Sequence, residues 1–201
     1  MPSLGTYQGG LTAEQFLFSE IRIVSKLYLN GMGTEEIVQR AKEENLFQYP
    51  TEREIGRMAR ACCKRIEALG DSELVSALAC APAQVAKQIN LYAVMRHNRI
   101  VWDFMVHVIG EKFLHQDMSF CRKDLNLFFT ELQAQNDAVA QWSDSTVNKI
   151  KGVLTRMLVE AEYLDTVRAV ELNPVLLSEE LERGIRANHD LDALPAFCCF
   201  R

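Results

Sequence analysis

Basic side chains recur at helical spacing between residues 53 and 64, and their chemistry suits phosphate recognition. Four cations fall at i, i+4, i+7 and i+11, on one face of a helix: Arg53, Arg57, Arg60 and Lys64. Six apolar residues form the opposite stripe: Ile55, Met58, Ala59, Cys62, Ile66 and Leu69. Guanidinium groups are planar, permanently charged donors that fit phosphates and guanine edges. The alternative interpretation is a solvated face, partly neutralised by Glu52, Glu54 and Glu67.

A second basic segment lies in the helix predicted after Ser145. It contributes Lys149, Lys151 and Arg156 as further candidate DNA contacts. A hairpin expected beyond this helix would complete the element order of a winged helix, with Arg168 on or near the wing. With only three basic residues in the helix, a solvated surface is the simpler interpretation.

Side chains that could catalyse a reaction or hold a metal ion form no recognisable constellation. The four histidines do not occur in an HExxH spacing, and the phosphate-loop, dinucleotide and nucleophile-elbow motifs are missing. His107 and Glu111 stand one helical turn apart and could form half a metal site, but such pairs are more often surface hydrogen-bonding partners. We therefore expect no enzymatic activity, no metal and no cofactor.

The six cysteines also lack the spacing of a zinc or redox motif. Cys62 and Cys63 point about 100° apart on a helix and cannot both face one ligand. Buried free thiols are the expected state. Cys198 and Cys199 could oxidise, but they suggest no mechanism.

Composition and charge narrow the class of protein. The chain has 201 residues, 48% of them hydrophobic and 24% charged, which is typical of a soluble globular protein. A net charge of −5 excludes a polycation that coats nucleic acid, but not a local basic face. Residues 1–70 hold 9 basic and 9 acidic residues, whereas 71–201 hold 13 and 18, so the N-terminal part repels phosphate less. Apolar runs fall far short of the ~18 residues of a membrane span, and residues 1–10 lack a signal-peptide layout, so we expect a cytoplasmic protein with no membrane contact.

The elements that carry these residues are predicted to be mostly α-helices. Capping boxes at Thr12–Gln15 and Thr51–Glu54 start helices that end near Gly31 and Gly70, with a further helix from Thr34 to about Asn45 between them. The later helices are expected at 72–80, 83–96, 99–115, from a cap at Ser119, at 138–142, from Ser143 or Ser145 to 161, and from Ser178. Alternation over 163–177, around Asn173-Pro174, predicts two short strands.

These elements suggest three modules in one compact unit. Residues 1–70 read as a helix-turn-helix-like module, 71–118 as central apolar helices, and 119–201 as a C-terminal helical module with a short β-hairpin, resembling a winged helix. The predicted helices 83–96 and 99–115 are apolar on nearly every side, which indicates a helix pair buried at the centre of the molecule. The expected fold class is mostly α.

Ordered sequence segments over residues 8–187 resemble the BrxA family of the bacteriophage exclusion (BREX) phage-defence systems. The segments are Gly10-Leu-Thr-Ala-Glu-Gln-Phe-Leu17, Glu20-Ile-Arg-Ile-Val24, Leu29-Asn-Gly31, Glu43-Glu-Asn-Leu46, Leu69-Gly70, Trp142-Ser-Asp-Ser-Thr146, Ala161-Glu-Tyr-Leu-Asp165 and Asn173-Pro-Val-Leu-Leu177. The resemblance implies a small, helical, non-enzymatic component that binds DNA and acts beside other BREX defence proteins. The family has also been compared with an RNA-binding antitermination factor, and it supplies no catalytic motif to carry over.

Together these observations predict a protein that binds double-stranded DNA, largely through phosphates. Reversing charge at Arg57 and Arg60 is then expected to weaken DNA binding without unfolding the protein. Two alternatives stay open: a protein-interaction scaffold within the defence complex, and an RNA-binding protein that prefers single strands or loops. A steep dependence of affinity on salt would distinguish DNA binding from the scaffold.

Overall fold

The computed structural model describes Tyr7, Leu11 and residues 15–200, and it is mostly α-helical, as the sequence predicts. The helices are α1 (Phe18–Leu29), α2 (Thr34–Glu43), α3 (Glu52–Leu69), α4 (Ser72–Cys80), α5 (Ala83–His97), α6 (Arg99–Phe104), the π-helix η2 (Met105–Gly110), α7 (Glu111–Leu114), α8 (Arg122–Gln135), α9 (Asp137–Ala140), α10 (Asp144–Glu160), α11 (Glu179–Ala187) and the 3-10 helix η3 (Leu191–Phe197). Within this described part, none is long and apolar enough to cross a membrane.

Local signals in the sequence fix both ends of α3. The Thr51 hydroxyl accepts a hydrogen bond from the Glu54 backbone amide at 3.3 Å, which satisfies one unpaired donor of the first turn. Gly70 ends the helix in a left-handed conformation with φ 65°, and Asp71 then caps α4. The long α3 is therefore defined almost entirely by its own sequence.

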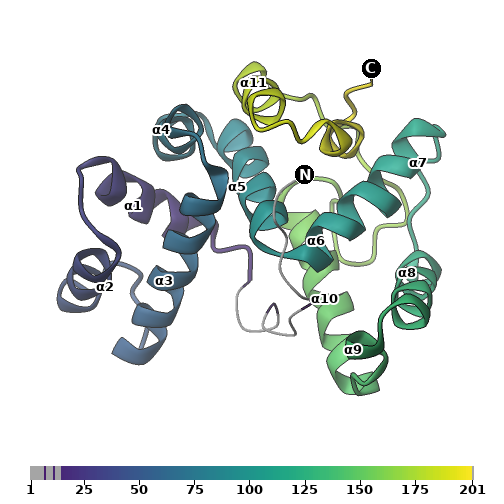
Figure 1. The fold of residues 1–201 in the computed structure, drawn as a ribbon, viewed down its shortest axis with the longest axis horizontal. Coiled ribbons are helices and arrows are strands. Elements are labelled where there is room, and N and C mark those ends of the chain that lie inside the picture. Colours follow the sequence, from purple (N-terminus) through teal and green to yellow (C-terminus); the bar gives the residue numbers. More distant parts are fainter. Residues whose placement is uncertain (1–6, 8–10, 12–14, 201) are drawn as a thin grey trace.

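Helices α1 to α4 form one end of an elongated molecule, and α5 joins them to the middle of it (Figure 1). α3 contacts α1, α2 and α5, and α4 lies against α1 and α5 (Figure 1). The loop between α2 and α3 spans eight residues, Glu44–Thr51, whereas four residues, Asn30–Gly33, join α1 to α2. The loop between α2 and α3 is longer than the three- to four-residue turn that typically joins the two helices of a helix-turn-helix.

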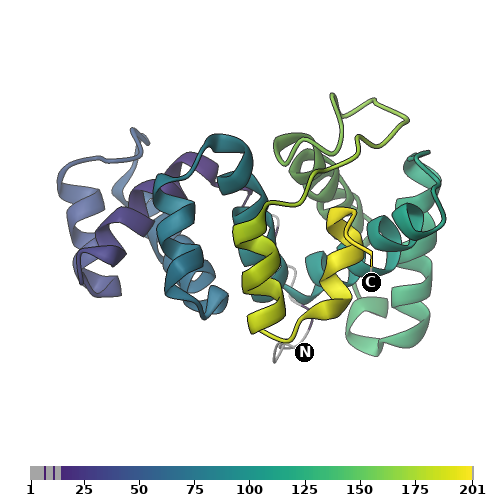
Figure 2. The same cartoon turned by 90° about the horizontal axis from the view of Figure 1, so that it is seen from above.

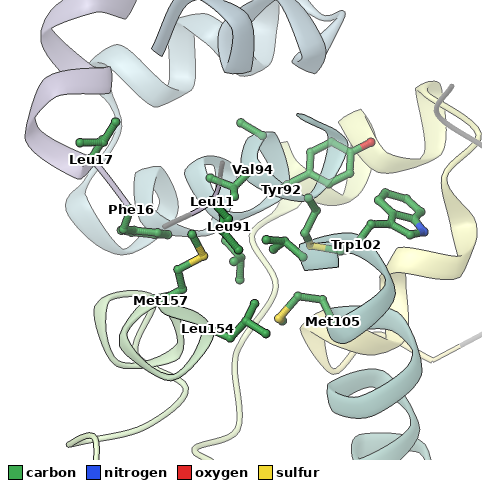
Figure 3. Packing of buried hydrophobic residues seen from close by; sticks show 14 of the residues in the cluster. Leu11, Phe16, Leu17, Leu91, Tyr92, Val94, Trp102, Met105, Leu154 and Met157 are labelled. Carbon is green, nitrogen blue, oxygen red and sulfur yellow. The ribbon is translucent and has the colours of Figure 1, made fainter. Parts of the chain in front are cut away.

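The predicted central helix pair is present; α5 is buried, whereas the second helix is buried on one side and exposed on the other. α5 buries residues on all sides, including the polar Gln88 and Asn90. The second helix runs from Arg99 to Leu114, with the π-helical turn η2 in its middle. One apolar core joins the two halves of the molecule (Figure 3). It contains Leu91 of α5, Met105 of η2, and Leu154 and Met157 of α10.

The C-terminal segment packs back onto the earlier helices. α11 contacts α4 and α5, and η3 contacts η2 and α7 (Figure 2). A buried network of hydrogen bonds holds the C-terminal segment against α3 and α5. Tyr92 Oη donates to Asp190 Oδ2 at 2.7 Å, and the Asn188 amide donates to the Leu69 carbonyl at 3.0 Å. Arg96 donates to the same carbonyl at 3.1 Å, so α3, α5 and the C-terminal segment share one cluster of hydrogen bonds.

The predicted hairpin over 163–177 does not form, and this prediction was wrong. The segment is irregular; its backbone meets Met118–Phe120 through a single antiparallel bridge between Ser119 and Glu171. The Asn173 side-chain amide instead donates hydrogen bonds to the Glu162 carbonyl and to the Asp165 carboxylate. These bonds hold the Asn-Pro segment in a loop. The loop projects from the surface (Figure 2).

Two helix starts also differ from expectation. α8 is capped at Cys121, where the Asp124 carboxylate accepts the Cys121 amide at 2.7 Å, while the Ser119 hydroxyl donates to Asp117. α1 starts at Phe18; the predicted capping box at Thr12–Gln15 falls mostly outside the described residues. Ser143 is confirmed as the cap of α10, and Ser178 as the cap of α11.

Candidate nucleic-acid interface

Helix α3 places the four predicted cations on its solvent side. All six apolar residues of the opposite stripe are buried, with exposed fractions of 4% or less. The four cations are exposed: Arg53, Arg57, Arg60 and Lys64. From the first to the last they span eleven residues, or about 16 Å of helix, which is the length of about five base pairs.

The four cations differ in how free their charges are. The Arg60 guanidinium makes two hydrogen bonds to the Glu35 carboxylate, at 2.9 and 3.3 Å, and these bonds lower the pKa of Glu35. Both side chains are exposed, so water and salt screen the pair. In contrast, Arg53 and Lys64 make no ion pair or hydrogen bond through their side chains within the described residues.

Arg57 stands at an acidic cleft between α3, α1 and α10. The cleft has a volume of about 480 Å³, and its lining includes Glu20, Glu54 and Glu160 beside Arg57. Burial, together with the charge of Glu20, raises the pKa of Glu160. Three carboxylates against one guanidinium disfavour a phosphate in the cleft itself. The most accessible positive charges on α3 are therefore those of Arg53 and Lys64.

The second predicted set is divided between two sides of α10. Lys149 and Arg156 are exposed and seven residues apart, so they share one face. Lys151 points toward α8 instead, where its ammonium donates to Asn126 Oδ1 at 2.8 Å and lies over the Phe129 ring. Desolvation and the nearby charge of Arg122 lower the pKa of Lys151. The structure thus places the charge of Arg122, which was not among the predicted contacts, close enough to Lys151 to repel it.

The buried Arg65 was not among the predicted site residues. Its guanidinium donates to the carbonyls of Phe16 at 3.0 Å and of Gln15 at 2.8 Å, which fixes the chain just before α1. Asn90 donates to the same Phe16 carbonyl at 2.8 Å. The signal was its position, since Arg65 lies three residues after Cys62 within the buried stripe of α3.

The predictions about metal ligands and cysteines can be compared with the described side chains. Among the described residues, no three His, Cys, Asp or Glu side chains gather closely enough to hold a metal ion. Glu111 meets His115 at 3.5 Å rather than His107. Cys62 and Cys63 are buried, as predicted, and neither is in a disulfide bond within the described residues; burial raises the pKa of Cys63 to about 11. Cys80 and Cys121 are exposed, which the sequence analysis did not expect.

The fold and this surface define a class: a helical protein in which one long helix exposes a row of cations over a fully buried stripe. The family model that matches the chain is BrxA, over residues 5–189, and the chain belongs to the BrxA family. It is similar to the "BREX protein BrxA" of Bacillus cereus (strain H3081.97), with 32% identity over 92% of each chain. The proteins of the same name from Paramagnetospirillum magneticum (strain ATCC 700264 / AMB-1) and Escherichia coli O9:H4 (strain HS) are each 24% identical; the first match covers 92% of both chains, and the second covers 87% of this chain and 81% of the relative.

The fold itself has a solved counterpart. The crystal structure of an uncharacterized protein from Magnetospirillum magneticum superposes with a TM-score of 0.80 at 23% identity, covering 96% of this chain and 98% of that one. At that identity the match supports the helical architecture alone.

Proposed function

We propose that this chain is a non-enzymatic, DNA-binding component of a BREX phage-defence system, working in the cytoplasm beside other BREX proteins. Membership of the BrxA family and relatives named BREX proteins support the defence role. The DNA-binding role depends on one observation: Arg53 and Lys64 are exposed on α3, about 16 Å apart, with no carboxylate paired to either in the described part of the chain. Unpaired cations are what a phosphate backbone attracts most strongly.

In this proposal α3 lies along the duplex and acts mainly through phosphates. Arg60 joins the contact by exchanging Glu35 for a phosphate, because an exposed ion pair is held weakly. Arg57 and the pair Lys149 and Arg156 contribute long-range attraction, and Lys151 contributes least because Asn126 and Phe129 already hold its ammonium. In this proposal α2 and α3 act as a helix-turn-helix-like pair, with an eight-residue loop in place of the shorter turn that is typical of that motif.

The test is a paired charge reversal measured by fluorescence anisotropy on a random-sequence duplex. Arg53→Glu with Lys64→Glu removes two phosphate contacts, which at 0.15 M salt corresponds to a loss of affinity of about 30-fold. Lys26→Glu with Arg183→Glu is the matched control, since both side chains are exposed and the change in net charge is the same. An equal effect of both pairs, or no effect of the first, would contradict the proposal.

A further inference from the structure

A groove with an apolar floor and acidic walls lies between η2, α7 and α8, far along the chain from α3. Its volume is about 270 Å³, and Val108 and Phe128 are among the residues that line it. Leu127 stands in the groove with 56% of its surface exposed, and Leu114 nearby on α7 is 47% exposed. An exposed Leu beside an apolar groove offers the kind of contact that the apolar face of a docked helix covers.

The π-helical turn η2 holds one side of this groove in place. Gly110 packs so closely on η3 that an added Cβ would lie 3.2 Å from the Ala196 backbone nitrogen, so this side of the helix is fixed against the C-terminal segment. The opposite side, with Val108, faces the groove. Such π-turns within α-helices are frequently found at functional sites.

The charges around the groove are predominantly negative. The Lys112 ammonium lies 2.8 Å from Asp117 and 3.1 Å from Asp124, so its charge is already offset twice. The hydrogen bond from Lys112, together with those from Ser119, lowers the pKa of Asp117 to about 2, which keeps that carboxylate charged at neutral pH. Glu111 and Glu131 add two exposed carboxylates, and the histidines His107 and His115 also line the groove, His115 at 3.5 Å from Glu111.

We propose that this groove binds a basic amphipathic helix of a partner protein, whose apolar side chains cover Leu127 while its Lys or Arg residues face the carboxylates. The floor is apolar and too small for a drug-sized ligand, so it fits individual side chains of a docked helix. The excess of carboxylates selects a cationic partner and repels nucleic acid. The groove is therefore a protein-binding surface, separate from the cations of α3 and independent of the DNA-binding proposal.

The experiment uses two synthetic helical peptides that share a Leu stripe and differ only in their polar face, Lys in one and Glu in the other. Binding to the full chain is measured by anisotropy, and the site is mapped by amide chemical shifts. We expect the Lys peptide to bind below about 1 mM, to shift amides of residues 107–131, and to bind at least tenfold more tightly than the Glu peptide.

Two variants test the contacts. Leu127→Ala is expected to weaken binding of the Lys peptide about tenfold, because a buried Leu contact is lost. Leu176→Ala is the matched control, since Leu176 is 84% exposed on the loop after α10. Glu111→Gln with Glu131→Gln should reduce the preference for the Lys peptide, and none of these variants should alter DNA affinity more than twofold. No saturable binding, equal affinity for both peptides, or an unchanged affinity in Leu127→Ala would overturn the proposal.

Discussion

The buried network around Asp190 allows a quantitative prediction for Tyr92→Phe. The Asp190 side chain is fully buried, and its only hydrogen bond within the described residues comes from Tyr92 Oη at 2.7 Å. Arg96 Nε forms an ion pair with Asp190 Oδ2 at 3.6 Å, which is beyond hydrogen-bond distance. Removing the hydroxyl therefore leaves a buried carboxylate without a hydrogen-bond donor. A hydrogen bond to a charged group contributes about 1.5–3 kcal/mol, and we expect a loss near the upper end, about 3 kcal/mol.

Urea unfolding monitored by circular dichroism measures this loss, and thermal unfolding should show a decrease in Tm of about 6–12 °C for a chain of this size. Tyr28→Phe is the control, because Tyr28 is partly exposed and its hydroxyl makes no hydrogen bond in the described structure. A double-mutant cycle with Asp190→Ala should give a coupling energy above about 1 kcal/mol. A loss below about 1 kcal/mol in Tyr92→Phe would refute the reasoning.

Three further outcomes follow from the same structure. Thr51→Ala should lower the free energy of unfolding by about 1 kcal/mol in a urea titration, because α3 loses its N-cap. Gly184→Val should cost about 1–3 kcal/mol in the same assay, since even its Cβ would lie 2.4–2.8 Å from three atoms of the buried Leu74. The pKa of Tyr7 is raised to about 12, mainly by burial and next by the hydrogen bond to Asp103. Burial also raises the pKa of Tyr92. The folded state then keeps protons that the unfolded state releases, so stability should fall as pH rises above about 10, less steeply in Tyr92→Phe; a stability constant to pH 11 would contradict this.

Where local signals dominate, the sequence predicted the structure well. α3 was correct at both ends because Thr51 and Gly70 act on their own helix, and its exposed cations followed from the 3.6-residue period. The burial of α5 was recognised because apolar residues recur on nearly every side of that helix, whereas the exposed side of the second helix was not predicted. The family was identified from short segments in their order along the chain, and the match to the BrxA model confirms it.

Where long-range packing decides, the sequence did not suffice. Alternation over 163–177 resembles strands, but without a neighbouring sheet the segment makes one bridge to Ser119 and is otherwise held by scattered hydrogen bonds, including those of Asn173 and the one from Gln88 to the Leu176 carbonyl. The burial of Arg65 could not be predicted, because the carbonyls to which it donates belong to the chain before α1. Arg57, unlike Arg53, lies in a cleft with Glu160, which is about a hundred residues further along the chain, so the sequence alone does not show that its charge is partly offset.

The salt dependence of duplex binding by the unmodified protein tests the central claim most directly. The three α3 cations that contact phosphates in this proposal, Arg53, Arg60 and Lys64, predict that log K falls with log salt concentration at a slope of about −2.7. Affinity should then drop about 40-fold between 50 and 200 mM salt. A slope near zero, or no binding at 50 mM salt, would show that α3 presents a solvated surface and not a DNA-binding face.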